Sequence, residues 1–125
     1  MLDTNALMMP FEFGIDLFGE LTGVLGAFDA LVPAEVITEL RGLSIGNGKN
    51  QAAARFGLTV AARCTLIPEL DADLSVDDKV AARAEEFNAV VVTNDKALRK
   101  KLLDKSIPVV VLRSRSRLEL IGRQI

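Results

Sequence analysis

Short apolar runs recur along the chain and predict buried β-strands. They occupy residues 1–2, 30–32, 65–67, 89–92 and 109–112, and several are rich in Val or Ile. None shows the strict alternation of apolar and polar residues that is typical of a strand with one solvent-exposed face. Runs of this kind favour the strands of a parallel sheet that is covered by helices on both faces.

Between the apolar runs lie segments with the three- and four-residue spacing of amphipathic helices. One apolar stripe consists of Ile15, Phe18, Leu21, Val24, Leu25 and Phe28. Pro33 suits the first position of a second helix, which Gly42 is expected to end. Residues 51–63 are rich in Ala and predict a third helix after the irregular stretch at residues 43–49.

Two further helices carry capping signals. Ser75 and Asp78 have the spacing of a capping box, which predicts a helix that begins directly after Ser75. A last helix is expected over residues 96–104, and either Thr93 or Asn94 can cap it. Strands that alternate with helices along a whole chain predict an α/β fold with right-handed crossovers. A length of 125 residues fits one domain, residues 1–125, which ends in a basic segment at residues 113–125.

Composition excludes several kinds of chemistry. The chain has no His, one Cys, no Trp and no Tyr. It therefore lacks His-based acid–base catalysis and thiolate zinc clusters, and with only six Phe it is poorly supplied with aromatic platforms for base stacking. Carboxylates, hydroxyls, amides and the basic side chains remain, and this set favours a metal ion that is bound by oxygen atoms.

Charge is distributed unevenly along the chain. Residues 1–95 carry 15 acidic and 6 basic side chains, whereas residues 96–125 carry 9 basic and 2 acidic ones. The asymmetry indicates an acidic site beside a surface that binds polyanions. The alternative, in which residues 96–105 are only the solvated face of a helix, stays open.

Two acidic residues follow predicted strands closely. Asp3 comes directly after the run at residues 1–2, and Asp95 follows the run at residues 89–92. Because the carboxyl ends of parallel strands lie at one edge of the sheet, we expect both side chains at that edge. Carboxylates about 4 Å apart repel by roughly 4 kcal/mol at a protein surface, so a group of them favours a divalent cation.

At four places the chain resembles the PIN domain family: Asp3-Thr4-Asn5, Glu39 within VPAEVITEL, Asp77 within DDKVAARA, and Thr93-Asn94-Asp95. The resemblance spans residues 1–112 and extends to archaeal members that are related to nucleases of ribosomal-RNA processing. It implies a three-layer α/β/α sandwich with a central parallel sheet of about five strands. It also implies a metal-dependent endoribonuclease.

The third acid of the pattern falls on one of two neighbours. In the family this acid opens a helix, with an apolar residue three positions later and a small residue seven positions later. From Asp77 these steps reach Val80 and Ala84, whereas the same steps from Asp78 reach a poorer pair. Asp77 is therefore the better match.

The resemblance implies catalytic roles for Asp3, Glu39, Asp77 and Asp95. Asp3 and Asp95 would be the principal ligands of Mg²⁺, for which Mn²⁺ is the natural substitute. Asp77 would bind the ion directly or through a water molecule. Glu39 would bind a second ion or orient a water. Each acid also has a local explanation: Asp77 and Asp95 can stabilise helix N-termini by about 0.3–1 kcal/mol, and Asp3 can cap a turn. Glu39, four residues after Glu35, can belong to a solvated helix face.

Neutral and basic side chains complete the implied site. Asn5 and Thr93 would hold the carboxylates and the water shell of the metal by hydrogen bonds. If the last strand continues beyond residue 112, its alternating arginines lie on one face. Four basic residues are expected to contact RNA phosphates: Lys96, Arg113, Arg115 and Arg117.

Several biological settings stay open at this stage. By resemblance, the protein is a VapC-like toxin that pairs with an antitoxin, or a nuclease that acts on pre-ribosomal particles. A non-catalytic RNA-binding PIN module and a receiver-like phosphoacceptor domain are the alternatives. We expect a homodimer through residues 8–13 and the first predicted helix. The stretch at residues 6–14 is apolar for an expected loop, and either a partner surface or a contribution to the core explains it. We also expect a cytoplasmic protein outside membranes, with Cys64 as a core residue.

Overall fold

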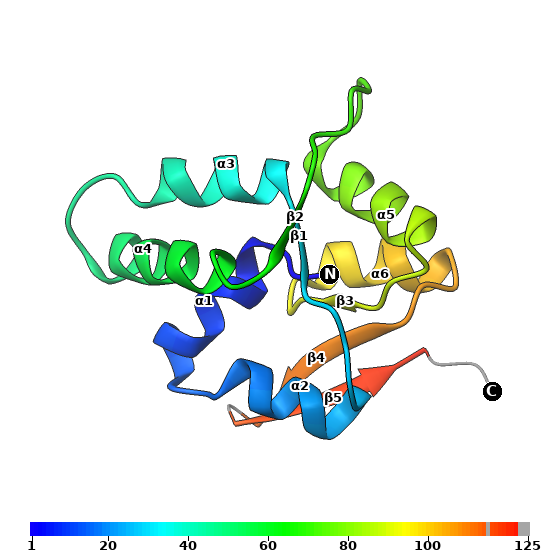
Figure 1. The fold of residues 1–125 in the computed structure, drawn as a ribbon, viewed down its shortest axis with the longest axis horizontal. Helices are drawn as coiled ribbons and strands as arrows, with labels where there is room; N and C mark the ends of the chain where they lie inside the picture. The colour runs from blue at the N-terminus through cyan, green and yellow to red at the C-terminus, as the bar shows by residue number, and fades with distance from the viewer. Residues whose placement is uncertain (115, 123–125) are drawn as a thin grey trace.

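The computed structural model describes residues 1–114 and 116–122, which form six helices and five strands (Figure 1). The helices are α1 (Thr4–Phe13), α2 (Leu17–Leu25), α3 (Ala34–Leu43), α4 (Lys49–Ala61), α5 (Val76–Glu86) and α6 (Lys96–Asp104). The strands are β1 (Leu31–Pro33), β2 (Thr65–Ile67), β3 (Val91–Val92), β4 (Val109–Arg113) and β5 (Arg117–Ile121). The predicted α/β class is confirmed.

The strands form two small sheets on either side of the N-terminal segment. β1 pairs with β2 in parallel, β3 pairs with β4 in parallel, and β4 pairs with β5 in antiparallel orientation. Leu2 forms a single parallel bridge with Val92, and its N–H donates to the carbonyl of Leu31 at 2.9 Å. The strands therefore form a two-stranded and a three-stranded sheet instead of one parallel sheet of about five strands. Residues 1–2 lie between the two sheets but are too short to pair as a full strand.

β5 differs from the prediction for the C-terminal segment. β4 ends at Arg113, and β5 runs back along it, so that Arg113 and Arg117 are directly opposite cross-strand partners. Ser114 in the turn has a positive φ of 48°. Arg113 and Arg117 therefore share a face across two strands, and Arg115 lies outside the described residues.

Helix α1 occupies most of the stretch that was expected to be a loop. Pro10, which is unfavourable in a helix interior, lies within it. Burial outweighs this cost, since Leu7, Met8 and Met9 are all core residues. The C-terminal end of α1 is different: Phe11 and Phe13 are 46% and 44% exposed. The apolar stretch therefore serves mainly as core.

The predicted helix boundaries were mostly close to the observed ones. Ser75 is confirmed as the cap of α5, because its hydroxyl accepts the N–H of Asp78 at 3.1 Å. Pro33 lies one residue before α3, and Gly42 lies inside that helix instead of ending it. The expected cap of α6 was wrong, since Asp95 takes that position.

The helices pack tightly around the strands. Figure 1 shows β1 and β2 between a group formed by α1, α3 and α4 and a second group formed by α5 and α6. Gly57 allows α4 to approach α1, because a Cβ at this position would lie 3.2 Å from the carbonyl oxygen of Leu7. None of the helices in the described ranges is both long and apolar enough to cross a membrane.

Candidate active site

A cleft of about 340 Å³ opens where the first turns of α1, α5 and α6 face α3. Its walls carry carboxyl, hydroxyl and amide groups over an apolar floor that includes Val36, Val80 and Leu98. Five acidic residues line it: Asp3, Glu12, Glu39, Asp77 and Asp95. The structure thus brings together all four acids that the sequence singled out, from positions 92 residues apart.

Asp3 lies at the inner end of the cleft. It caps α1 through its Oδ1 atom, which accepts the N–H of Ala6 at 2.8 Å, and its residue is only 6% exposed. Burial raises the pKa of Asp3 to about 7, and the negative charges of Asp95 and Asp77 raise it further. Hydrogen bonding by Thr93 and by the N–H of Ala6 opposes this rise in pKa.

Asp95 occupies the corresponding position on α6. Its Oδ1 atom accepts the N–H of Leu98 at 3.0 Å, and its own N–H donates to the Thr93 hydroxyl at 3.0 Å. Thr93 is fully buried at the end of β3. Asp3 and Asp95 therefore each use Oδ1 for a helix cap, which leaves Oδ2 outside the cap on both residues.

Asn5 stabilises the turn that carries Asp95. The Asn5 Oδ1 atom accepts the N–H of Asn94 at 3.0 Å, and the Asn94 Oδ1 atom accepts the N–H of Leu112 at 2.9 Å. These two bonds connect α1, the turn after β3, and β4. Asn5 was predicted to hold carboxylates or the water shell of a metal; in the structure it binds backbone.

Asp77 and Asp78 have different environments at the start of α5. Asp77 lines the cleft, and its pKa is raised by burial and then by the neighbouring Asp95, against the lowering effect of Lys101. Asp78 instead forms an ion pair with Lys101 at 3.0 Å, and this pairing lowers its pKa. The structure thus assigns the cleft-facing position to Asp77.

Glu39 lines the cleft from α3. Its Oε1 atom accepts a hydrogen bond from the hydroxyl of Thr4, which follows Asp3 in the chain. Thr4 is one of the cleft residues that the sequence analysis missed. The hydrogen bond connects α3 to the first turn of α1 and orients the Glu39 carboxylate.

Sequence analysis also missed Met8, Glu12 and Asn50, all of which line the cleft. Burial raises the pKa of Glu12. Thr4, Met8 and Glu12 are spaced four residues apart, so they lie along one face of α1. In a helix over residues 4–13, this four-residue spacing places Met8 and Glu12 on the same face as Thr4, beside Asp3.

Three of the basic residues expected to contact RNA, Lys96, Arg113 and Arg117, do not line the cleft, and Arg115 lies outside the described residues. Lys96 is exposed in the first turn of α6, directly after Asp95. Arg113 is exposed and forms an ion pair with Glu119 at 2.8 Å, and Arg117 lies opposite it. Arg113 at the end of β4 and Arg117 at the start of β5 thus lie at the end of the sheet where Asp95 follows β3.

The donor set of the cleft suits a hard divalent cation, because it consists of oxygen atoms. Several like charges face one space, and burial raises the pKa of Asp3 and Asp77, an effect that a cation would reverse. Within residues 1–114 and 116–122, no group of three or more Cys, Asp or Glu side chains is arranged so that it could hold a metal ion. The cleft therefore fits a divalent cation by its negative charge and its oxygen donors, and not by a preformed set of ligands.

Comparisons with known proteins agree with this arrangement. Residues 1–115 match the family model of a PIN-like domain. "Ribonuclease VapC9" of Archaeoglobus fulgidus is 30% identical over 118 residues, which cover 94% of this chain and 84% of that protein. "Ribonuclease VapC4" of Methanocaldococcus jannaschii is 28% identical over 124 residues, covering 96% of this chain and 94% of that protein.

A solved structure shares the fold. The chain superposes on the PIN domain endonuclease Utp24 with a TM-score of 0.78 at 23% identity, covering 98% of this chain and 90% of the other. At this identity the likeness concerns the fold alone. Taken with the match over residues 1–115, these findings show that the chain belongs to the PIN-like domain family.

Proposed function

We propose that this protein is a metal-dependent endoribonuclease of the VapC toxin type, which hydrolyses phosphodiester bonds in RNA. The observation that carries the proposal is the cleft in which Asp3, Glu39, Asp77 and Asp95 meet. The names of the two archaeal relatives, both ribonucleases matched over nearly the whole chain, support the same activity.

In this proposal the four carboxylates hold the cation and orient water. A divalent ion such as Mg²⁺ or Mn²⁺, when bound, supplies charge stabilisation and water activation for phosphodiester hydrolysis. Asp3 and Asp95 would hold it through the oxygens that their helix caps leave outside, and Asp77 would hold it directly or through water. Glu39 would bind a second ion or orient water.

The supporting residues keep these carboxylates in place. Thr93 contacts Asp3 and accepts the N–H of Asp95, so one buried hydroxyl connects both acids. Asn5 holds the turn between β3 and α6 by accepting the backbone N–H of Asn94. Without a cation, Asp3 is protonated below a pH of about 7, so we expect proton and metal to compete at this group.

A direct test is cleavage of a fluorescently labelled single-stranded RNA with Mn²⁺, with Mg²⁺ and with EDTA. We expect cleavage only with a divalent ion, and a loss of about 100-fold or more in Asp3→Asn. The matched control is Asp16→Asn, which changes another helix-capping aspartate that does not line the cleft. Equal cleavage by Asp3→Asn and the wild type would refute the enzyme and leave a non-catalytic RNA-binding module.

RNA is proposed to bind through the phosphate contacts of four basic residues: Lys96, Arg113, Arg115 and Arg117. If four such side chains contact phosphates, the logarithm of the binding constant should fall with the logarithm of salt concentration at a slope of about −3. Replacing Lys96 and Arg117 by Gln should reduce this slope by about 1.4. A flat salt dependence would remove these residues from the RNA site.

The toxin setting predicts a small antitoxin partner. Co-expression with the neighbouring reading frame should protect cells from the wild type, and Asp3→Asn should be harmless alone. Co-sedimentation with pre-ribosomal particles would instead favour the ribosome-maturation setting. A homodimer also stays a prediction, which light scattering tests. Met8 and Met9 are buried, so Phe11 and Phe13 remain as its exposed surface on α1.

A further inference from the structure

The connection between β2 and α5 leads into the first turn of α5, which carries Asp77. Beyond residues 68–70 the chain projects away from the helices before it turns into α5 (Figure 1). Residues 71–76 are all exposed, and Leu74 is 47% exposed although it is apolar. Burial therefore does little to fix this connection, so its position depends on polar contacts at its base.

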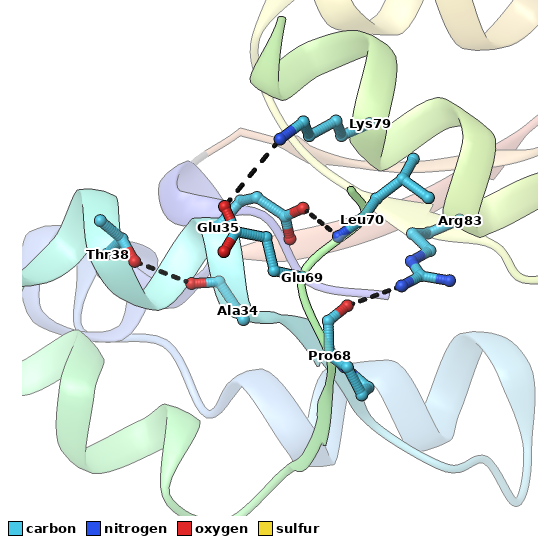
Figure 2. A network of polar contacts seen from close by, with 8 residues as sticks. All are labelled: Ala34, Glu35, Thr38, Pro68, Glu69, Leu70, Lys79 and Arg83. Atoms are coloured by element: carbon cyan, nitrogen blue, oxygen red, sulfur yellow. Dashed lines mark hydrogen bonds and ion pairs between the residues drawn. The ribbon is translucent and has the colours of Figure 1, made fainter. Parts of the chain in front are cut away.

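Glu35 of α3 supplies one of these contacts. Its residue is only 7% exposed, and its Oε2 atom accepts the backbone N–H of Leu70 at 2.8 Å (Figure 2). The Oε1 atom is buried without a hydrogen-bond partner among the described residues. A buried carboxylate with a free oxygen is costly, so its presence requires an explanation beyond packing.

α5 supplies contacts from the opposite side. The Arg83 Nη2 atom donates to the carbonyl of Pro68 at 2.8 Å, and Lys79 lies 4.0 Å from the carboxylate of Glu69 (Figure 2). Residues 68–70 are thus held between two helices, α3 through Glu35 and α5 through its basic side chains.

From Leu70 a series of local hydrogen bonds leads to the cleft. The Leu70 carbonyl accepts the N–H of Ala72 at 3.0 Å, and the Ala72 carbonyl accepts the N–H of Leu74 at 3.0 Å. Ser75 then caps α5, whose second residue is Asp77. Displacement of Leu70 would therefore reach the first turn of α5 through a compact segment and not through a slack loop.

Glu35 lies four residues, about one helical turn, before Glu39 on α3. Glu39 enters the cleft, whereas Glu35 points to the connection at residues 68–70. One helix thus carries an acid of the cleft and, one turn earlier, an anchor for the segment that leads to another acid.

We propose that Glu35 is a positioning residue for Asp77: it anchors Leu70 and thereby fixes the first turn of α5 relative to α3. The catalytic part of this inference rests on the proposed ribonuclease function. The structural part does not, since it concerns only how firmly the start of α5 is held.

The test compares Glu35→Ala, Glu35→Gln and the wild type, with Glu20→Ala as matched control. Glu20 of α2 also accepts a distant backbone N–H, that of Leu118 at 3.3 Å, but it leads to no residue of the cleft. Hydrogen exchange of residues 68–80 is measured by mass spectrometry, and the Mn²⁺ concentration for half-maximal RNA cleavage is measured alongside.

We expect Glu35→Ala to speed exchange at residues 70–78 and to raise the half-maximal Mn²⁺ concentration by about 10-fold. Glu35→Gln keeps an acceptor for Leu70 and should restore both. Glu20→Ala should change neither, even if it lowers the melting temperature. If Glu35→Ala does not fold, Glu35→Asp, which withdraws the carboxylate by one methylene group, takes its place with the same expectations.

Unchanged exchange at residues 70–78 in a folded Glu35→Ala protein would overturn the proposal. So would an unchanged Mn²⁺ requirement despite faster exchange, because the anchor would then not act on Asp77. If the wild type does not cleave RNA with any divalent ion, the ribonuclease function fails. The exchange data would then still decide whether Glu35 fixes the start of α5.

Discussion

The first turns of α1 and α2 are the same local structure in two different places. Asp3 accepts the N–H of Ala6 at 2.8 Å, and Asp16 accepts the N–H of Gly19 at 3.1 Å. Asp3 is buried beside Asp77 and Asp95, whereas Asp16 is exposed and lies outside the cleft. A capping aspartate therefore indicates a helix start, and only its burial among like charges makes it a candidate for chemistry.

The largest expected difference is in stability without metal. The pKa of Asp3 rises from 3.8 to about 7 on folding, so the folded protein holds a proton between these values that the unfolded chain has lost. Stability from this group is therefore full below a pH of about 4 and is lost as the pH rises to about 7. At pH 8 the loss amounts to at most about 4 kcal/mol.

Asp3→Asn removes this loss and keeps an acceptor for Ala6. In EDTA at pH 8 we expect it to be more stable than the wild type by a few kcal/mol, up to about 4. At pH 4 the difference should nearly vanish, because the wild-type group is then protonated. Urea unfolding measures both. Asp16→Asn should show no such gain, and an equal gain there would abolish the contrast between the two caps.

Metal binding should reverse the sign of the Asp3 effect, because a bound cation makes the charged Asp3 carboxylate stabilising. Mn²⁺ that binds only the folded state stabilises it by about 2.7 kcal/mol at a hundredfold excess over its dissociation constant. If Asp3 must lose its proton first, affinity at pH 5 falls by about 100-fold, and the same Mn²⁺ concentration stabilises by only about 0.4 kcal/mol. Thermal melting at both pH values measures this.

Asp16→Asn should keep the full response to Mn²⁺, and Asp3→Asn should lose it. A melting temperature of the wild type that responds to neither Mn²⁺ nor EDTA at pH 8 would contradict a metal site in the cleft.

Asp95 sharpens the comparison, because it lies in the cleft but is exposed. Asp95→Asn keeps the cap on Leu98 and removes one carboxylate from the cleft. We expect RNA cleavage to fall by at least about 10-fold, with a change of stability within about 0.5 kcal/mol. Cleavage assays and urea unfolding of the same preparation measure the two effects. A stability gain like that expected for Asp3→Asn would show that burial is not the distinguishing factor.

The sequence predicted those features that depend on local chemistry or on sheet topology. The cap formed by Ser75 needs only residues within one helical turn. Asp3 and Asp95 reach the same cleft because each follows a segment that runs parallel to its neighbour. Topology therefore suffices to bring these acids together, whereas their catalytic roles stay predictions.

Other features depend on contacts between distant parts of the chain. α1 forms around Pro10 because its apolar residues find a core, which local propensity does not reveal. Thr93 and Asn94 are both good helix caps in isolation. Thr93 is instead buried at the end of β3, and the side chain of Asn94 binds Leu112, so the cap falls to Asp95. β5 was missed although Leu118 and Leu120 alternate with polar residues.

The smallest effect concerns Asp16 itself. Asp16→Ala removes an exposed cap and should destabilise the protein by about 1 kcal/mol, whereas Asp16→Asn, an equally good cap, should cost almost nothing. RNA cleavage should be unchanged in both variants, because the residue does not line the cleft. Urea unfolding and the cleavage assay decide the matter. Reduced cleavage by folded Asp16→Ala protein would mean that the first turn of α2 acts on the cleft after all, and burial would no longer separate the two aspartates.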